Sequence, residues 1–231
     1  MGLSEVQRTL ALLLTNAELR DRLRAGTESA NAVAKELGLD AADLAQVQHF
    51  AMAELERSAR SLHAKRWQEI QKLLPLSLKA AALSLSVHAE NSSNDPGAGD
   101  LPSTPGKAKN PLFRLFTRFA ETCVPGGSKR HANDAIAFAN WVNEHAKSTP
   151  ANSETLPWLP DLLRYEATWL RLHIDTRPRF LHIERYRYPA PRIATDLTQT
   201  TPDMGQIVTR PTLVCWLRVS PTTNIRMIPL F

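Results

Sequence analysis

The spacing of apolar residues changes from helical to strand-like late in the chain. Up to about residue 175, apolar residues recur at intervals of three and four, which places their side chains on one face of a helix. After Thr176, β-branched and aromatic residues alternate with polar ones, and prolines separate the runs. The sequence therefore predicts an α+β fold, in which a mostly helical N-terminal part is followed by a small three-stranded antiparallel sheet.

Residues 1–89 are expected to form a helical domain. This stretch is rich in Ala, Leu, Glu, Lys, Gln and Arg, which are good helix formers. Residues that favour helix ends stand at suitable intervals: Ser4, Asn16, Thr27 and Asp40 at N-termini, and Gly26 and Gly38 at C-termini. We expect four helices, the longest opening at Asp40 and running to Pro75, which should kink or end it. A new helix should follow Pro75.

Residues 90–110 contain Ser, Asn, Asp, Gly and Pro in place of residues that could pack a core, which predicts a flexible linker or an insertion. Residues 111–175 return to helical spacing. Helices are expected from Pro111 to about Pro125, over Asn133–Lys147 and within Leu156–Leu172. On the last of these, Glu166 shares the apolar face, so it is either a paired, buried carboxylate or the edge of the apolar stripe.

Residues 176–231 are expected to form a β-sheet domain. Three segments have strand patterns: Arg179–Tyr188, Thr212–Val219 and Ile225–Phe231. Pro189 and Pro191 should end the first strand, and Thr195–Gly205 is polar enough to be a loop. The second and third strands should form a hairpin. A sheet this small leaves at least one edge with unpaired backbone donors and acceptors.

Most of the excess positive charge lies in the C-terminal part. The formal net charge is +5, and residues 158–231 contribute ten arginines, no lysine and six acidic residues. Arginine suits bidentate or stacked recognition of carboxylates, phosphates and peptide backbones. We therefore expect an acidic, or at least an extended and polar, partner for this part of the chain, although a solvated basic surface would have the same composition.

No pattern of catalytic or metal-ligating residues is present. The sequence has no HExxH, GxSxG or glycine-rich phosphate motif, its seven histidines are scattered singly, and its two cysteines, Cys123 and Cys215, stand among apolar neighbours. We predict no catalytic residue, no metal ligand and no cofactor in this chain, and a binding protein rather than an enzyme. No apolar run approaches the roughly 18 residues that span a bilayer, so we expect a cytoplasmic protein without a membrane partner.

Ser29–Val47 has the spacing of a helix-turn-helix, with a glycine at the turn, so a DNA-binding regulatory protein is the alternative function. The second helix of this motif carries acidic and apolar residues where phosphate contacts need Arg or Lys. We therefore do not expect nucleic acid as the partner.

Strand addition to the small sheet is the binding mode that we favour. A disordered peptide can pair with an open sheet edge, gaining affinity from main-chain hydrogen bonds and specificity from alternate side chains. The candidate peptide-binding residues are Arg185, Tyr186, Arg187, Trp216, Arg218 and Arg226. The alternative for Tyr186 and Trp216 is that their rings cover helices.

Two segments carry a resemblance to a known family. Leu55–Ala82 and Leu156–Leu172 resemble the HvfC-, MbnC- and TglI-type partner proteins of multinuclear non-haem iron-dependent oxidases in ribosomal peptide modification, and the layout is most similar to the TglI type. The matching motif is Leu159, Pro160, Asp161 and Leu162 with Glu166, for which the resemblance implies a structural role.

The resemblance implies a non-catalytic subunit that forms a heterodimer with the oxidase, which would hold the iron. Its C-terminal sheet would act as a recognition element for the leader of a precursor peptide. It would thereby present the C-terminal cysteine of that peptide for oxidative excision of the cysteine β-carbon, as in 3-thiaglutamate formation.

Overall fold

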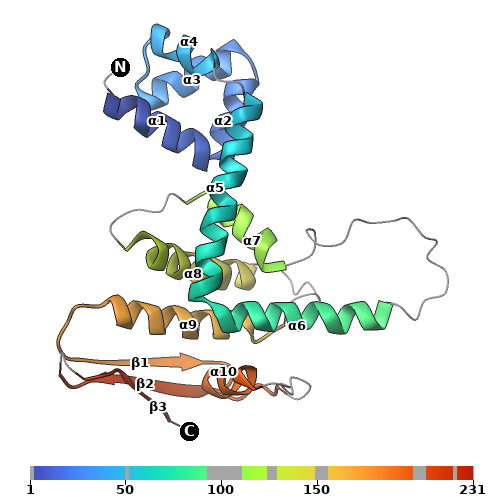
Figure 1. Cartoon of the computed structure of the whole chain (residues 1–231), viewed down its shortest axis with the longest axis vertical. Coiled ribbons are helices and arrows are strands. Elements are labelled where there is room, and N and C mark those ends of the chain that lie inside the picture. Colours follow the sequence, from blue (N-terminus) through green and yellow to red (C-terminus); the bar gives the residue numbers. More distant parts are fainter. Residues whose placement is uncertain are drawn as a thin grey trace. The chain divides into compact units, whose positions relative to one another are not determined.

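The computed structural model describes residues 3–49, 52–92, 111–123, 129–148, 156–199, 207–220 and 223–230 (Figure 1). The helices are α1 (Leu3–Thr15), α2 (Ala17–Arg24), α3 (Thr27–Leu37), α4 (Ala41–His49), α5 (Met52–Leu73), α6 (Pro75–Ser92), α7 (Pro111–Ala120), α8 (Arg130–Ser148), α9 (Leu159–Ile174) and α10 (Ala190–Thr198). The strands are β1 (Phe180–Tyr186), β2 (Thr212–Arg218) and β3 (Arg226–Leu230). The predicted α+β class is confirmed.

The chain forms two compact units. The first comprises residues 1–68 and 116–125, and the second comprises residues 69–115 and 126–231. The division between the units falls within α5 and within α7, whereas we expected boundaries at residues 89, 110 and 175. The sheet shares its unit with α6, α8 and α9. The expected linker, residues 90–110, overlaps the end of α6, and from residue 93 onward it lies outside the described residues.

In the first unit, two of the expected helix caps form hydrogen bonds. The Asn16 carbonyl Oδ1 accepts the backbone N–H of Leu19 at 3.1 Å, and Asp40 Oδ1 accepts that of Asp43 at 2.7 Å. Gly38 ends α3 in the left-handed conformation with φ 71°, a conformation that costs glycine little because it has no Cβ.

Three expected caps are wrong by one or two positions. Gly26, with φ 123°, is the N-cap of α3 rather than the end of α2, which is capped by Ala25. Thr27 is therefore the first residue of α3, and α1 already includes Ser4. A glycine followed by a threonine satisfies either assignment, because both residues favour helix ends.

The expected long helix after Asp40 corresponds to α4 and α5, and residues 50 and 51 between them lie outside the described residues. Pro75 acts as predicted: α5 ends at Leu73, and α6 begins at the proline. Pro111 likewise begins α7, but this helix ends at Ala120, earlier than the expected stop at Pro125.

The helices of the second unit pack around α9, which contacts α8, α6 and α10. Two lysines stabilise helix C-termini there. Lys79 of α6 donates to the carbonyl oxygens of Leu197, at 2.5 Å, and Gln199, at 3.0 Å, and Lys129 donates to the carbonyl oxygen of Ile174. Each ammonium group therefore satisfies carbonyl groups that a helix end leaves unpaired.

The loop that we expected over Thr195–Gly205 is wrong for its first four residues. Residues 190–198 form α10, and Pro191 occupies the first turn, where the missing N–H of proline costs no hydrogen bond. Ile193, Ala194 and Leu197 are buried on one face of this short helix. Residues 200–206 lie outside the described residues.

The strands form an antiparallel sheet in the order β1-β2-β3, so β2 is central and the expected hairpin of β2 and β3 is confirmed. In the register, Ile183 of β1 lies opposite Cys215 of β2, which lies opposite Ile228 of β3. Figure 1 shows α9 beside β1 and α10 at one end of the strands.

Candidate functional site

One face of the sheet forms a core with α9. The side chains of Phe180, Tyr186, Val214 and Trp216 are buried on this face together with Leu172 of α9. Tyr165 of α9 packs against two of these rings, with centroid distances of 6.0 Å to Tyr186 and 5.3 Å to Trp216. This face therefore stabilises the fold and is closed to a partner.

The opposite face is open and mostly apolar. In the three rows of cross-strand neighbours its side chains are Leu181–Leu217–Arg226, Ile183–Cys215–Ile228 and Arg185–Leu213–Leu230. Of the nine large apolar side chains that are exposed in the described part of the chain, five lie on this face. The solvated face of an antiparallel sheet is normally polar, so this composition is unusual.

Pro229 reveals which backbone groups of the strands point toward the free edges of the sheet. Proline has no N–H, so the pair Pro229↔Val214 cannot exchange the two hydrogen bonds of a bonded pair. Bonded and non-bonded pairs alternate, so the N–H and C=O groups of even-numbered β2 residues point toward β1. The even-numbered β2 residues pair with the even-numbered residues of β1, whose N–H and C=O groups therefore point toward β2. The N–H and C=O groups of Leu181, Ile183 and Arg185 in β1 point the other way, toward the free edge of the sheet.

A side-chain contact supports this assignment independently. The Arg164 guanidinium of α9 donates a hydrogen bond to the backbone carbonyl oxygen of Arg185, which must therefore be accessible outside the β1–β2 ladder. Among the described residues, no hydrogen bond involves the outward N–H and C=O groups of Leu181 and Ile183. These two residues are 63% and 55% exposed.

The two edges of the sheet are not equivalent. On β3, the outward positions are Met227 and Pro229, and the proline supplies no donor. On β1, three outward N–H groups are present and the carbonyl groups of Leu181 and Ile183 are unused. The β1 edge is therefore the better template for an added strand.

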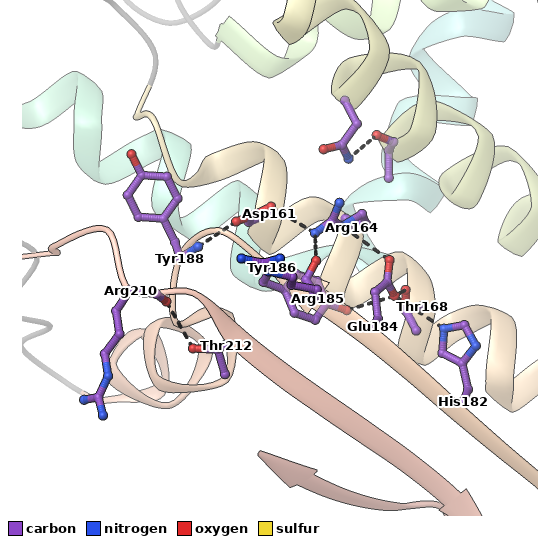
Figure 2. Close-up of polar contacts among 12 residues, drawn as sticks. Asp161, Arg164, Thr168, His182, Glu184, Arg185, Tyr186, Tyr188, Arg210 and Thr212 are labelled. Atoms are coloured by element: carbon purple, nitrogen blue, oxygen red, sulfur yellow. Dashed lines mark hydrogen bonds and ion pairs between the residues drawn. The ribbon is translucent and has the colours of Figure 1, made fainter. Parts of the chain in front are cut away.

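Arg164 fixes the end of this edge by joining α9 to β1 (Figure 2). Its guanidinium lies 3.2 Å from Asp161 Oδ1 and 3.3 Å from Glu184 Oε1, and 4.8 Å above the centre of the Tyr186 ring. With the bond to the Arg185 carbonyl, one cation thus serves three acceptors on two elements. The other Asp161 oxygen accepts the backbone N–H of Tyr188 at 2.8 Å.

The Glu184 carboxylate contacts several donor groups on the face of β1 that packs against α9. Its Oε2 accepts the Thr168 hydroxyl at 2.5 Å and the Tyr186 hydroxyl at 3.1 Å, and lies 3.5 Å from His182 Nε2 (Figure 2). Burial, followed by the charge of Glu184, raises the pKa of Tyr186 well above its ordinary value, so the phenol stays protonated and can donate. This cluster of side chains stabilises the packing of α9 against β1.

The structure places three of the predicted peptide-binding residues in packed positions. Tyr186 and Trp216 are 0% and 1% exposed, which corresponds to the alternative interpretation that their rings cover helices. Arg218 lies 5.1 Å from the Phe180 ring centre and donates to the carbonyl oxygens of Asp175 and Arg177. We therefore do not retain these three as contact residues in the proposal below.

The other three predicted residues are exposed. Arg185 and Arg226 occupy opposite corners of the open face, and Arg187, just after β1, lies 5.7 Å from the Tyr188 ring centre. The sequence-based prediction did not include Arg164, Leu181 and Ile183. The alternation in residues 179–188 predicted a strand but could not show which of its two sides faces α9.

The motif that carries the family resemblance lies in the packing of α9. Leu159 and Leu162 are buried, Pro160 stands in the first turn, and Asp161 contacts β1 as described above. Glu166 is the paired, buried carboxylate of the two alternatives. Its two oxygens accept the backbone N–H groups of Leu76 and Ser77 and the Ser77 hydroxyl at the start of α6.

The helix-turn-helix spacing corresponds to α3, the turn at Gly38, and α4. The exposed side chains described on α4 are Ala41, Ala42 and Ala45, and its sequence contains no Lys or Arg. Phosphate binding depends on such cations, and α4 supplies none of them.

No family model and no curated protein matches this sequence. None of the helices in the described ranges has an apolar stretch long enough to cross a bilayer. Within the same residues, no group of three or more His, Cys, Asp or Glu side chains is placed to hold a metal ion.

Proposed function

We propose that this chain is a peptide-binding subunit that captures an extended segment of another polypeptide as a fourth strand beside β1. The observation that carries the proposal is the outward, unused pair of N–H and C=O groups on Leu181 and Ile183. Each such residue can form two hydrogen bonds with an added strand. The Arg164 contact to the Arg185 carbonyl would limit the pairing at that end.

Charge favours an acidic segment. Arg177, Arg179, Arg185 and Arg187 are exposed before, within and after β1, and of the nearby acids Asp175 pairs with Arg177 and Glu184 with Arg164. An acidic peptide would therefore gain both faster association and a preferred orientation from this strip. The side chains of the added strand that face α9 would lie near His182 and Glu184.

The family resemblance supplies the finer proposal. The bound segment would be the leader of a ribosomally made precursor peptide, and the second partner would be a multinuclear iron-dependent oxidase in a heterodimer. The oxidase would contribute the iron and modify the C-terminal cysteine, by β-carbon excision of the 3-thiaglutamate type. This chain would contribute binding and positioning, with no catalytic group of its own.

Hydrogen exchange of the full chain tests the binding mode. The probe is a candidate precursor peptide, added at saturating concentration. Strand addition predicts slower exchange of the Leu181 and Ile183 N–H groups, with little change at Met227 on the other edge. Protection that misses β1, or no binding of the peptide, contradicts the proposal. Co-purification of this chain with a candidate iron-dependent oxidase tests the heterodimer separately.

A further inference from the structure

The open face of the sheet is a second surface, distinct from the β1 edge. Seven of the nine side chains in its three rows are Leu, Ile or Cys, and the other two are Arg185 and Arg226. No acidic side chain stands among the nine. Sheets with apolar residues on both faces are normally covered on both faces, and here α9 covers only one.

The two arginines define a direction across this face. Arg185 stands on β1 in one outer row, and Arg226 stands on β3 in the other outer row, so they occupy diagonally opposite corners. The other diagonal runs from Leu181 through Cys215 to Leu230 and is wholly apolar. An elongated apolar segment of a partner that lies along this second diagonal would have one arginine on each side.

The dimensions of the face match a single helix. Five residues along each strand and three strands across give a patch of about 13 Å by 10 Å, close to the roughly 10 Å diameter of a helix. We propose that this face docks an amphipathic helix of a partner protein, with its apolar stripe on the Leu181–Cys215–Leu230 diagonal and acidic residues on both flanks opposite Arg185 and Arg226.

Charge and composition argue against the other occupants. A second copy of the chain would bring two more arginines toward this face and no acid from its own face. The segments of this sequence outside the described ranges, such as 93–110, 149–155 and 200–206, are polar and lack an apolar stripe. A membrane surface is generally contacted through Trp or Tyr, and the nine positions contain no aromatic residue.

Cys215, at the centre of the face, reports on occupancy. Its alkylation by iodoacetamide is followed by peptide mapping of the full chain, which separates it from Cys123, the other cysteine. The probe is a synthetic helix of about 15 residues with leucines on one face and glutamates on both flanks. The control helix has the same leucines with lysines in place of the glutamates.

The proposal predicts that the glutamate helix slows alkylation of Cys215 about tenfold at saturation, and that the lysine helix binds about tenfold more weakly. The double variant Arg185→Glu/Arg226→Glu changes two exposed side chains and should reverse this preference. An extended peptide paired with β1 would leave the central Cys215 reactive, so this result is independent of the proposed function.

Three results would overturn the proposal. The first is unchanged alkylation with the glutamate helix, or a preference that the double variant does not reverse. The second is protection that rises with protein concentration alone and accompanies a dimer in sedimentation, which would identify a second copy as the occupant. The third is equal protection by phosphatidylserine vesicles, which would identify a lipid surface.

Discussion

The Glu166 carboxylate of α9 binds Ser77 at the start of α6, 89 positions away in the sequence, through both the backbone N–H, at 2.8 Å, and the hydroxyl, at 2.5 Å. Its other oxygen accepts the backbone N–H of Leu76 at 2.9 Å. The first N–H groups of a helix have no partner within the helix, so a side chain from a distant element performs the capping. Glu166 thereby fixes α6 to α9.

Replacement of Glu166 should destabilise the second unit. Glu166→Ala leaves two backbone N–H groups and a hydroxyl without an acceptor, so the free energy of unfolding should fall by about 2 kcal/mol. Glu166→Gln retains one acceptor oxygen and should lose about half of that amount. Urea denaturation followed by circular dichroism measures both. The account predicts this order of stabilities, and a Glu166→Gln variant that is less stable than Glu166→Ala would contradict it.

The same carboxyl group should make stability depend on pH. Burial raises the pKa of Glu166 above its ordinary value, against the opposing effect of the hydrogen bonds from Ser77 and Leu76. The folded chain then holds this proton at pH values where the unfolded chain has lost it. The free energy of unfolding should therefore fall as the pH rises from the ordinary carboxyl value through the raised one.

Glu166→Gln removes this titration and serves as the control for the pH series. The stability difference between wild type and this variant should be largest in favour of wild type at about pH 4 and should shrink toward about pH 7. Urea denaturation at several pH values gives the slope. A difference that grows with pH would show that the folded state favours the charged carboxylate.

Arg164 should stabilise the junction of α9 and β1. Arg164→Ala leaves Glu184 and Asp161 without their cation, so the free energy of unfolding should fall by about 2 kcal/mol. Arg164→Lys should recover only part of this loss, because a single ammonium group cannot reach all the acceptors of the planar guanidinium. Arg171→Ala, an exposed arginine on the same helix, is the matched control and should change stability by less than about 0.5 kcal/mol.

Tyr186 and Arg185 are adjacent in β1 and should have separable roles. Tyr186→Phe removes the hydroxyl that donates to Glu184, so we expect a stability loss of about 1 kcal/mol with unchanged peptide affinity. Arg185→Glu changes an exposed side chain, so it should weaken binding of an acidic peptide without affecting stability. The weakening should be larger at low salt. Urea denaturation measures the stability of both variants, and fluorescence anisotropy measures their peptide affinity. A loss of affinity in Tyr186→Phe but not in Arg185→Glu would contradict this assignment of roles.

Local signals in the sequence predicted most of the elements. Asn16, Asp40, Gly38 and Pro75 act at the predicted helix ends because their effects depend on neighbouring backbone groups. The helix α10 was missed, although Pro191 in the first turn followed by Ile193 and Leu197 is compatible with a short helix. Its two threonines, Thr195 and Thr198, are poor helix formers, and the contacts of α10 with α9 and α6 override that preference.

The site depends on non-local contacts, so the sequence predicted less of it. In β1, Leu181 and Ile183 lie on the face of the sheet that is turned away from α9, while His182 and Glu184 lie on the face that packs against α9. Hydrophobicity alone would therefore predict the wrong face of β1 as the buried one. The inward polar residues are accommodated because Thr168, Arg164 and Tyr186 supply partners for Glu184. Those partners come from α9 and from β1 itself, and no local pattern identifies the helical ones.

The central claim, capture of a peptide at the β1 edge, is tested most directly by a pair of proline substitutions. The N–H groups of Ile183 and Met227 both point outward, on opposite edges, so proline at either position removes an edge donor without removing a bond of the sheet. The measurement is the affinity of a candidate precursor peptide for the wild type, Ile183→Pro and Met227→Pro by fluorescence anisotropy. The account predicts at least about a tenfold loss for Ile183→Pro and wild-type affinity for Met227→Pro. Equal affinities for all three proteins, or a loss confined to Met227→Pro, would contradict it.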